Sequence, residues 1–366
     1  MQAALPDVPA SSCLRGAWAV ALAAALASTA CALPERRATA TVPAAPPNAH
    51  AAPSPLAPAD AAALHRAADA ALARAPDPLA VAHIEGTLPT LPAYRRAQEA
   101  RRDWEAMATL AALYALEGNA RHRDGYARTL AAWLDVYVIS GNPIDESGLG
   151  HWLLAYRAAG AALPPALAER MRGFACGLAD RYLEPQPPSR RTSTNNWQSH
   201  RVKIAVMGAG VCADPARVAR ADAAFAAQVA ANLLPAGPSV DFAERDALHY
   251  VVYSLEPLLE AALFAHHGGR TLYAITGPQG QSIAATLDWL APYVRGEKTH
   301  DEFVRSQVRF DAERAAAGVP GFAGPFDPRA ARKAVWLAAR LDPQWQELSA
   351  KAGPPWITVR APWLAH

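Results

Sequence analysis

The sequence predicts an all-α protein, and three observations support this fold class. Amphipathic segments with helical spacing follow one another from about Ala61 to the end of the chain. Ala and Leu dominate these segments, and both residues have a high helix propensity. Strand-like alternation of polar and apolar residues is nearly absent.

The predicted helices are separated by short breaks that contain Gly, Pro or Asn, which are residues that end helices. Many antiparallel helix pairs in one domain require a closed or a stacked arrangement. We predict an (α/α) toroid, an incomplete barrel of antiparallel helix hairpins around a central cleft, because it accounts for the helix number and for polar clusters at helix ends. A solenoid of helical hairpins is the alternative, although no repeat of fixed period is visible. The predicted helices cover residues 61–75, 96–118, 121–139, 147–160, 164–183, 195–211, 215–234, 242–267, 279–294 and 328–350.

Residues 1–31 are predicted to be a signal peptide. Arg15 precedes an apolar run over residues 17–27, which is short for a membrane span and is followed by small residues. The ending Ser-Thr-Ala-Cys resembles a bacterial lipoprotein processing site, in which Cys31 would carry a lipid anchor. An Ala-rich leader without a targeting role is the alternative. We therefore expect a periplasmic or secreted protein, either free or anchored in a membrane through Cys31.

The remainder of the chain divides into a linker and one large domain. Residues 32–60 are rich in Ala, Pro and Thr and poor in large apolar residues, which predicts a flexible linker. Residues 61–366 follow as a single domain, since a 366-residue chain that is 52% hydrophobic can build a large core. After export, Cys176 and Cys212 can pair in an oxidising compartment; two buried free thiols are the alternative.

Charge and histidine distribution exclude some partners and cofactors. The formal net charge is +2 and charged residues make up only 19% of the chain, without a long Lys/Arg run. We therefore expect no nucleic-acid partner. The histidines are dispersed except for His266 and His267, which we interpret as a solvated helix end, so we expect no metal and no other cofactor. We expect a monomer.

Residues 241–257 contain an unusual combination of polar and aromatic side chains within a helical pattern. On a continuous helix, Asp246, His249, Tyr250 and Tyr253 occupy positions i, i+3, i+4 and i+7, so an acid, an imidazole and two phenols share one face. Arg245 precedes this set and points about 100° away from Asp246 on such a helix. A hydrogen-bonded, purely structural core is the alternative interpretation of this face.

A second polar cluster, over residues 192–200, opens another predicted helix. Thr194 or Asn195 is a good N-cap, which explains one polar residue of the cluster. Capping does not explain the others, and we expect the two clusters to face each other across a cleft. The unexplained residues are Asn196, Trp197, Gln198, His200 and Arg201.

The residue types in the two clusters suit removal of a proton next to a carboxylate. An Asn amide at a helix N-terminus, with the positive end of the helix dipole behind it, is a good partner for a carboxylate. A Tyr hydroxyl near positive charge can take or give a proton, and His249 can share that task or hold a carboxylate. The amide and the cations would stabilise the enolate-like charge, and Trp197 offers a flat face for a sugar ring.

Three loops carry more polar and aromatic residues than packing requires: 83–90, 140–147 and 298–303. Turn and capping chemistry is the alternative explanation for each of them. In the second loop, we predict that Asn142 and Glu146 contact a substrate.

Asn195 and Asn196, followed some fifty residues later by Asp-Ala-Leu-His-Tyr-Val-Val-Tyr-Ser-Leu-Glu-Pro over residues 246–257, resemble the alginate lyase family of α/α-toroid polysaccharide lyases. That family has an Asn-Asn-His motif at a helix start and a segment similar to Arg-Ala-Leu-Ala-Tyr-His-Asn-Tyr-Ala-Leu-Pro-Pro. The resemblance spans roughly residues 80–325. It implies that Asn196 neutralises a uronate carboxylate and that Tyr253 is the catalytic proton shuttle.

The chain departs from the family motifs at two positions, which makes it a divergent member. Trp197 stands where the family has His, and Asp246 stands where it has Arg. His200 or His249 can supply the imidazole and Arg245 the guanidinium. We predict β-elimination of an anionic uronic-acid polysaccharide, alginate or a related uronan such as glucuronan, with Asn196, His249 and Tyr253 as catalytic residues. The predicted substrate-binding residues are Asn142, Glu146, Asn195, Trp197, Gln198, His200, Arg201, Arg245, Asp246 and Tyr250.

Two other functions remain compatible with the sequence. An α/α-toroid glycoside hydrolase requires two carboxylates across the cleaved bond, for which the candidates are Asp246 with Asp145 or Glu146. A non-catalytic envelope protein would instead bind an oligosaccharide, with Trp104, Trp152 and Trp197 as stacking surfaces.

Overall fold

The computed structural model describes residues 56–187 and 189–365, and helices joined by loops account for the secondary structure there apart from two isolated β-bridges. The prediction of an all-α protein is confirmed. The predicted signal peptide, Cys31 and the linker up to residue 55 lie outside the described residues. Within the described ranges, no helix is both long enough and apolar enough to cross a membrane.

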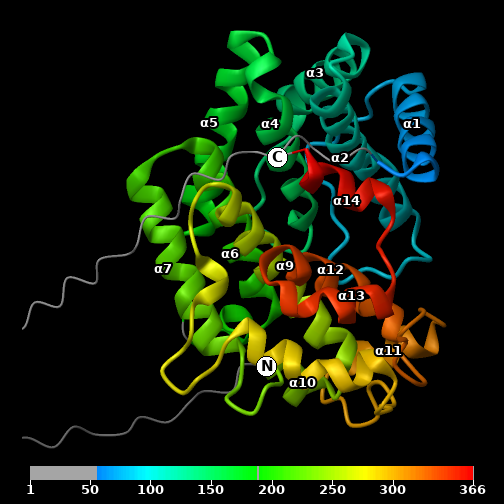
Figure 1. Ribbon diagram of the computed structural model, residues 1–366, viewed down its shortest axis with the longest axis vertical. Coiled ribbons are helices and arrows are strands. Elements are labelled where there is room, and N and C mark those ends of the chain that lie inside the picture. Colours follow the sequence, from blue (N-terminus) through cyan, green and yellow to red (C-terminus); the bar gives the residue numbers. More distant parts are fainter. Residues whose placement is uncertain (1–55, 188, 366) are drawn as a thin grey trace, which may run out of the picture. The chain divides into compact units, whose positions relative to one another are not determined.

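Many helices that are consecutive in the sequence pack side by side as antiparallel neighbours (Figure 1). Their bounds are α1 Pro58–Ala73, α2 Pro92–Glu117, α3 Ala120–Val136, α4 Gly150–Ala159, α5 Pro165–Tyr182, α6 Asn196–Cys212, α7 Pro215–Asn232, α8 Val240–Arg245, α9 Leu248–His267, α10 Ile283–Arg295, α11 Arg309–Ala316, α12 Arg332–Leu341, α13 Gln346–Ala352 and α14 Ile357–Leu364. Short 3-10 turns lie at Ser147–Leu149, Gly160–Ala162, Arg191–Ser193, Leu272–Ala274, Pro328–Ala331 and Pro343–Trp345.

Helices α6 and α9 pack against each other and form the centre of the described domain. Helix α6 also contacts α4, α5 and α7, while α9 contacts α8, α10 and α12. Both helices are buried along most of their length, as expected for helices surrounded by others. The first turns of α6 nevertheless bury Asn196, His200, Arg201 and Lys203. Such residues are rarely buried without a partner, so they mark the region that requires a functional explanation.

The predicted helix over residues 242–267 is wrong at one point, because the chain breaks between α8 and α9. Asp246 adopts φ +50°, a left-handed conformation that Asp tolerates better than most residues. Its carboxylate accepts hydrogen bonds from the backbone and side chain of Arg305 at 3.0–3.1 Å, and its carbonyl accepts one from the amide of Phe303 at 2.9 Å. Tertiary contacts with residues 300–305 therefore stabilise an interruption of the helix that the local sequence pattern does not predict.

Three further differences concern the C-terminal half of the chain. The predicted helix over 328–350 is divided into α12 and α13, because Pro343 cannot continue a helix and Asp342 caps the turn that follows. Helices α11 and α14 were not predicted, and both have only 8 residues. Segments this short carry little periodic signal.

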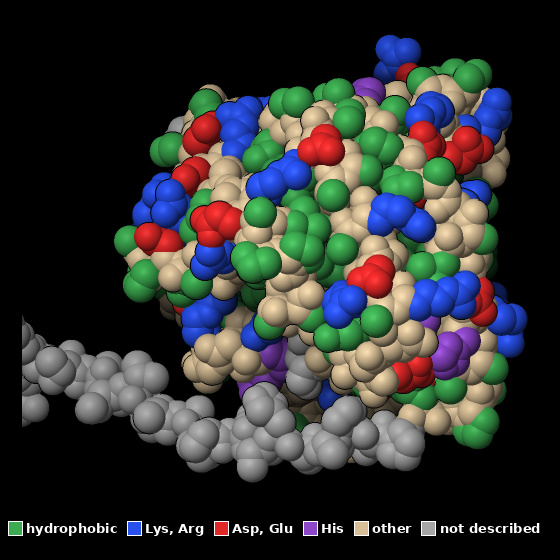
Figure 2. Space-filling view, turned by 90° about the horizontal axis from the view of Figure 1, so that it is seen from above, with side chains coloured by type: hydrophobic (Ala, Val, Ile, Leu, Met, Phe, Trp, Pro, Cys, Tyr) green, Lys and Arg blue, Asp and Glu red, His purple; other side chains and the backbone are tan. Residues whose placement is uncertain are grey.

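Cys176 of α5 and Cys212 at the end of α6 form a disulfide, with their Cα atoms 4.9 Å apart. The pairing alternative is therefore the correct one. The bond joins two helices that also pack extensively against each other. On the face shown in Figure 2, Lys and Arg side chains are interspersed with Asp and Glu rather than gathered into one basic patch.

Candidate active site

Two neighbouring cavities share one residue, Tyr253 of α9. We call the first cavity A; its volume is about 270 Å³, and Asn196, Trp197, Arg245, His249, Tyr250, Tyr253 and Arg314 are among its lining residues. We call the second cavity B; its volume is about 440 Å³, and His151, His200, Lys203, Tyr253, Glu256, Glu260, Lys333 and Trp356 are among its lining residues. The predicted meeting of the Asn196 cluster with the Tyr253 helix is therefore observed in cavity A.

Tyr253 lies between two imidazoles. The ring of His249 is nearly parallel to that of Tyr253, with centroids 6.5 Å apart, and lines cavity A with it. The ring of His200 is closer, at 4.6 Å, but it lines cavity B. His249 therefore shares a cavity with Asn196, and His200 faces the other side of the phenol.

The side chain of Asn196 is fixed by a buried carboxylate. Asp241 of α8 is fully buried and accepts hydrogen bonds from the Asn196 backbone amide at 3.1 Å and from its Nδ2. The same carboxylate also accepts from Asn232 Nδ2 at 2.9 Å and from Ser254 Oγ at 2.8 Å. Asp241 thus connects α6, α7 and α9 and holds the Asn196 amide in one orientation beside cavity A.

Two guanidinium groups contribute positive charge to cavity A. Arg245 is paired with the buried Asp311 and lies over the ring of Tyr250, 4.0 Å from its centroid. Arg314 of α11 donates a hydrogen bond to the Tyr250 hydroxyl at 3.0 Å. Arg245 thus faces the cavity, whereas Asp246 next to it pairs with Arg305. Arg314 was missed by the sequence analysis, because it lies on a short helix that the periodicity did not reveal.

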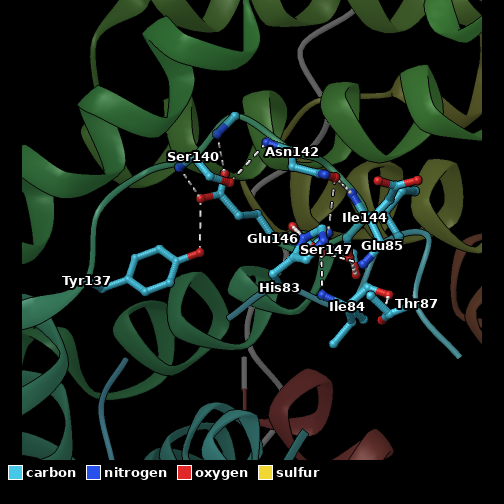
Figure 3. A network of polar contacts seen from close by, with 12 residues as sticks. His83, Ile84, Glu85, Thr87, Tyr137, Ser140, Asn142, Ile144, Glu146 and Ser147 are labelled. Atoms are coloured by element: carbon cyan, nitrogen blue, oxygen red, sulfur yellow. Dashed lines mark hydrogen bonds and ion pairs between the residues drawn. The ribbon is translucent and has the colours of Figure 1, made fainter. Parts of the chain in front are cut away.

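The loop over residues 83–90 forms another wall of cavity A, and the neighbouring loop over 140–147 supports it (Figure 3). Asp145 accepts hydrogen bonds from the backbone amides of Ile84 and Glu85 at 2.7 and 2.8 Å, and it pairs with His83. This buried carboxylate therefore holds the first loop in place against the site. The contact explains the polar character of both loops better than capping alone does.

Sequence comparison identifies the family of this chain. The family model described as alginate lyase matches residues 41–300, which is more than half of the 366 residues. The chain belongs to the alginate lyase family. It is an enzyme, a polysaccharide lyase. No curated protein sequence matches it.

Solved structures with a similar fold are themselves alginate lyases. An alginate lyase from Bacteroides ovatus superposes with a TM-score of 0.61 at 15% identity, covering 85% of this chain and 94% of that one. Alginate lyase A1-III from Sphingomonas species A1 gives a TM-score of 0.49 at 19% identity, covering 74% and 92% respectively. The described domain of this lyase is accordingly an α/α toroid, as predicted.

Several residues predicted to bind substrate in this lyase have local structural partners instead. Asn195 caps α6 by accepting from the Trp197 amide at 3.0 Å, and Gln198 accepts from Arg201 at 3.1 Å. Arg201 also donates to the Thr192 carbonyl at 2.6 Å. Neither cavity A nor cavity B is lined by any of the following predicted residues: Asn195, Gln198, Arg201 and Asp246.

Asn142 and Glu146 also belong to the support of the lyase rather than to its cavity walls. Glu146 is fully buried and accepts hydrogen bonds from the Tyr137 hydroxyl and the Ser140 amide (Figure 3). It also accepts one from the Tyr182 hydroxyl. Asn142 accepts from the Ile144 amide at 3.0 Å, which closes the turn. Structural turn chemistry accounts for both side chains.

Two tryptophans considered for sugar stacking are in the hydrophobic core. Trp104 and Trp152 are 1% and 0% exposed, and their ring centroids lie 6.1 Å apart within an aromatic cluster. Only an exposed face can stack on a sugar, so their assignment as stacking surfaces is wrong. Trp197 does line cavity A, with the Arg201 guanidinium 5.7 Å from its ring centroid.

Burial sets the protonation states of the groups around Tyr253. It raises the pKa of the Tyr253 phenol, an effect that Tyr250 reinforces and that Arg101 and Arg314 oppose. Burial, together with Arg314 and Arg245, lowers the pKa of His249 to about 4. At neutral pH the phenol is therefore protonated and the imidazole is neutral. A proton donor and a proton acceptor thus stand side by side in cavity A.

Within the described part of the chain, no group of three or more His, Cys, Asp and Glu side chains is arranged to hold a metal ion.

Proposed function

We propose that this lyase cleaves a uronic-acid polysaccharide, alginate or a related uronan such as glucuronan, by β-elimination. The observation that carries the proposal is the composition of cavity A, where Asn196, His249 and Tyr253 line one space together with two arginines. An amide and cations suit a carboxylate, while an imidazole and a phenol suit proton transfer. Family membership supports the same reaction class.

Substrate binding would use the polar wall of cavity A. The Asn196 amide, held by Asp241, would bind the uronate carboxylate, and Arg245 and Arg314 would add positive charge. Withdrawing charge from the carboxylate makes the proton on the adjacent C5 carbon more acidic. The same groups would stabilise the enolate-like charge that develops when this proton leaves.

Proton transfer would use the two rings beside the substrate. His249, neutral at pH 7, or Tyr253 would take the C5 proton, and Tyr253 would donate a proton to the departing glycosidic oxygen. The electron pair of the C5–H bond forms the C4=C5 double bond as the C4–O bond breaks. At pH 7 the lowered pKa of His249 leaves the imidazole unprotonated and the raised pKa of Tyr253 leaves the phenol protonated, which are the protonation states that an acceptor and a donor require.

The hydrolase alternative receives less support from the carboxylates named for it. Asp145 and Glu146 are buried and bonded to loop amides and tyrosines, and Asp246 pairs with Arg305. The residues that line cavity A include one acid, Glu85, which is not the pair that hydrolysis requires.

Incubation with alginate, glucuronan and other uronans tests the proposal. Elimination leaves an unsaturated sugar, so ultraviolet absorbance should rise with at least one of these polymers. Products without a double bond would instead indicate a hydrolase, and binding without turnover would indicate a binding protein.

A His249→Ala variant tests the role of the imidazole. General-base catalysis contributes roughly 10²- to 10⁴-fold, so a loss of this size in kcat is expected. The matched control is His65→Ala, because His65 lies on α1 and pairs with Glu117. Full activity in His249→Ala would assign the base to another group.

We also propose that the enzyme works outside the cytoplasm, free or anchored through Cys31, and as a monomer. The predicted signal peptide and the Cys176–Cys212 disulfide support export, since disulfides persist in oxidising compartments. Cell fractionation with mass spectrometry of the N-terminus tests the location and the anchor. A cytoplasmic protein that retains residue 1 would contradict the proposal.

A further inference from the structure

A third cavity lies at the other ends of the helices that form cavities A and B. Its volume is about 680 Å³, larger than that of cavity A or cavity B, and we call it cavity C. Its lining residues line neither of the other two cavities, and they include Tyr156, Arg157, Val211, Val218, Phe264 and Arg270. The α9 segment from Tyr253 to Phe264 is about 16 Å long, at about 1.5 Å per residue. Cavity C therefore lies outside the proposed reaction site.

Arg157 of α4 contributes a positive charge to cavity C without a carboxylate partner. Its guanidinium donates a hydrogen bond to the Phe264 carbonyl and lies over the Phe264 ring, 4.3 Å from its centroid. These contacts hold the end of α9, but a guanidinium has five N–H donors and a carbonyl does not neutralise its charge. In residues 56–187 and 189–365, no Asp or Glu side chain forms an ion pair with Arg157. Burial and the neighbouring Arg270 lower the pKa of Arg157 to about 10, so the charge is held there at a cost.

Arg270 is the second cation of cavity C. It pairs with Asp222, which does not line the cavity, and the residues that do line the cavity include no Asp or Glu. Two guanidinium groups therefore have one carboxylate between them, which leaves a surplus of one positive charge. A single bound monoanion would neutralise this surplus and could accept hydrogen bonds from both groups.

The rest of the wall of cavity C is largely apolar and limits the kind of anion that fits. Val211 and Val218 lie on it with Phe264, and Tyr156 adds a phenol ring. A sugar acid brings several hydroxyls that need partners when they are buried, and this wall offers few. A phosphate dianion exceeds the surplus charge, and the C-terminal ends of α4, α6 and α9, which meet at this cavity, add negative partial charge. A carboxylate on an apolar body fits both the wall and the charge.

We propose that cavity C binds a monocarboxylic acid with an apolar body. The carboxylate contacts Arg157 and Arg270, and the body packs against Val211, Val218 and Phe264. The inference goes beyond the proposed function and does not depend on it, because no residue of cavity A takes part. Binding can therefore be measured without any turnover of a polysaccharide.

Isothermal titration calorimetry of the full chain with benzoate and octanoate tests the inference. We expect at least one of these acids to bind. Glucuronate, inorganic phosphate and benzyl alcohol, measured at the same ionic strength, should each bind at least about 10-fold more weakly than that acid. Glucuronate keeps the charge on a hydroxylated body, phosphate keeps the charge without a body, and benzyl alcohol keeps the body without the charge.

Two variants locate the bound acid. Arg157→Gln removes the charge but keeps an amide that can donate to the Phe264 carbonyl, and it should weaken binding at least about 10-fold. Ala161→Glu places a carboxylate at an exposed position of the cavity wall and should weaken binding by at least as much. Val138→Glu is the matched control, because it adds the same charge at a 60% exposed position on the loop after α3, and it should bind as the wild type does.

Three results would overturn the inference. The first is that neither benzoate nor octanoate binds. The second is that glucuronate, phosphate or benzyl alcohol binds as tightly as the better of the two acids, which would assign the cavity to another class of ligand. The third is that Ala161→Glu binds the acid with wild-type affinity, and this variant decides the matter if Arg157→Gln does not fold. None of these results bears on the elimination reaction, which is tested separately by its unsaturated product.

Discussion

Replacing Asp241 with Asn changes one atom of the group that holds Asn196 in place. The carboxylate accepts hydrogen bonds from Asn196, Asn232 and Ser254, and it is fully buried. An amide of the same shape keeps one acceptor oxygen but presents an NH₂ group to donors on the other side. The Ser254 hydroxyl can rotate and accept from this NH₂ group, whereas the Asn232 NH₂ group cannot, so one donor loses its partner.

The expected cost of Asp241→Asn is roughly 2–4 kcal/mol in the free energy of unfolding. This range combines the loss of a charge-assisted hydrogen bond with a buried donor left unsatisfied. The oxygen that still accepts from the Asn196 amide is uncharged in this variant, so its hydrogen bonds are weaker and the amide is held less firmly. The value of kcat/KM should therefore also fall roughly 10- to 100-fold, equivalent to about 1.4–2.7 kcal/mol of transition-state stabilisation.

Urea unfolding and steady-state kinetics, measured where the variant remains folded, check both values. Ser254→Ala is the control, since it removes one partner of Asp241 and should cost about 1 kcal/mol with little effect on kcat. If Asp241→Asn had wild-type stability and wild-type kcat/KM, Asp241 would not be the positioning residue of the site.

Two other predictions concern stability. Replacing both Cys176 and Cys212 with Ser removes a cross-link between residues that are 36 apart in the sequence. This change should lower the free energy of unfolding by roughly 3–4 kcal/mol without changing kcat. An unchanged urea midpoint would show that the disulfide does not stabilise the fold. Burial raises the pKa of Glu302 from 4.5 to about 7, where its carboxylate accepts from the His249 amide at 3.3 Å. Between these two pH values the folded protein binds one more proton at Glu302 than the unfolded chain does. The free energy of unfolding therefore falls as the pH rises from 4.5 through 7. The total loss is roughly 3 kcal/mol, at about 1.36 kcal/mol per pKa unit. Glu302→Gln should gain stability relative to wild type over that window in urea titrations at a series of pH values, and parallel pH profiles would contradict the assignment.

The sequence was sufficient for the fold class and for the meeting of two distant segments. Helical periodicity and Gly/Pro breaks located most of the long helices, and Asn196 and Tyr253 line one cavity as expected from the resemblance. The disulfide was one of two open alternatives, because sequence does not report the distance between two thiols.

Other features depend on tertiary contacts that sequence patterns do not reveal. Asp246 breaks the helix because Arg305, 59 residues later, binds its carboxylate. Arg314 reaches cavity A from a helix of 8 residues, and Trp356 reaches cavity B from a loop. Conversely, Glu146 has the residue type of a ligand-binding group but is fully buried beneath the site. Residue type predicts the chemistry that a side chain can perform, whereas its position depends on distant parts of the chain.

The most direct test of the central claim is the rate at which Tyr253→Phe produces unsaturated sugar from the preferred uronan. The phenol ring and its packing remain, and only the hydroxyl that donates the proton is removed. We expect kcat to fall at least about 10²-fold with KM nearly unchanged, while Tyr114→Phe on α2 retains wild-type activity. A Tyr253→Phe enzyme within a few-fold of the wild-type rate would contradict the account.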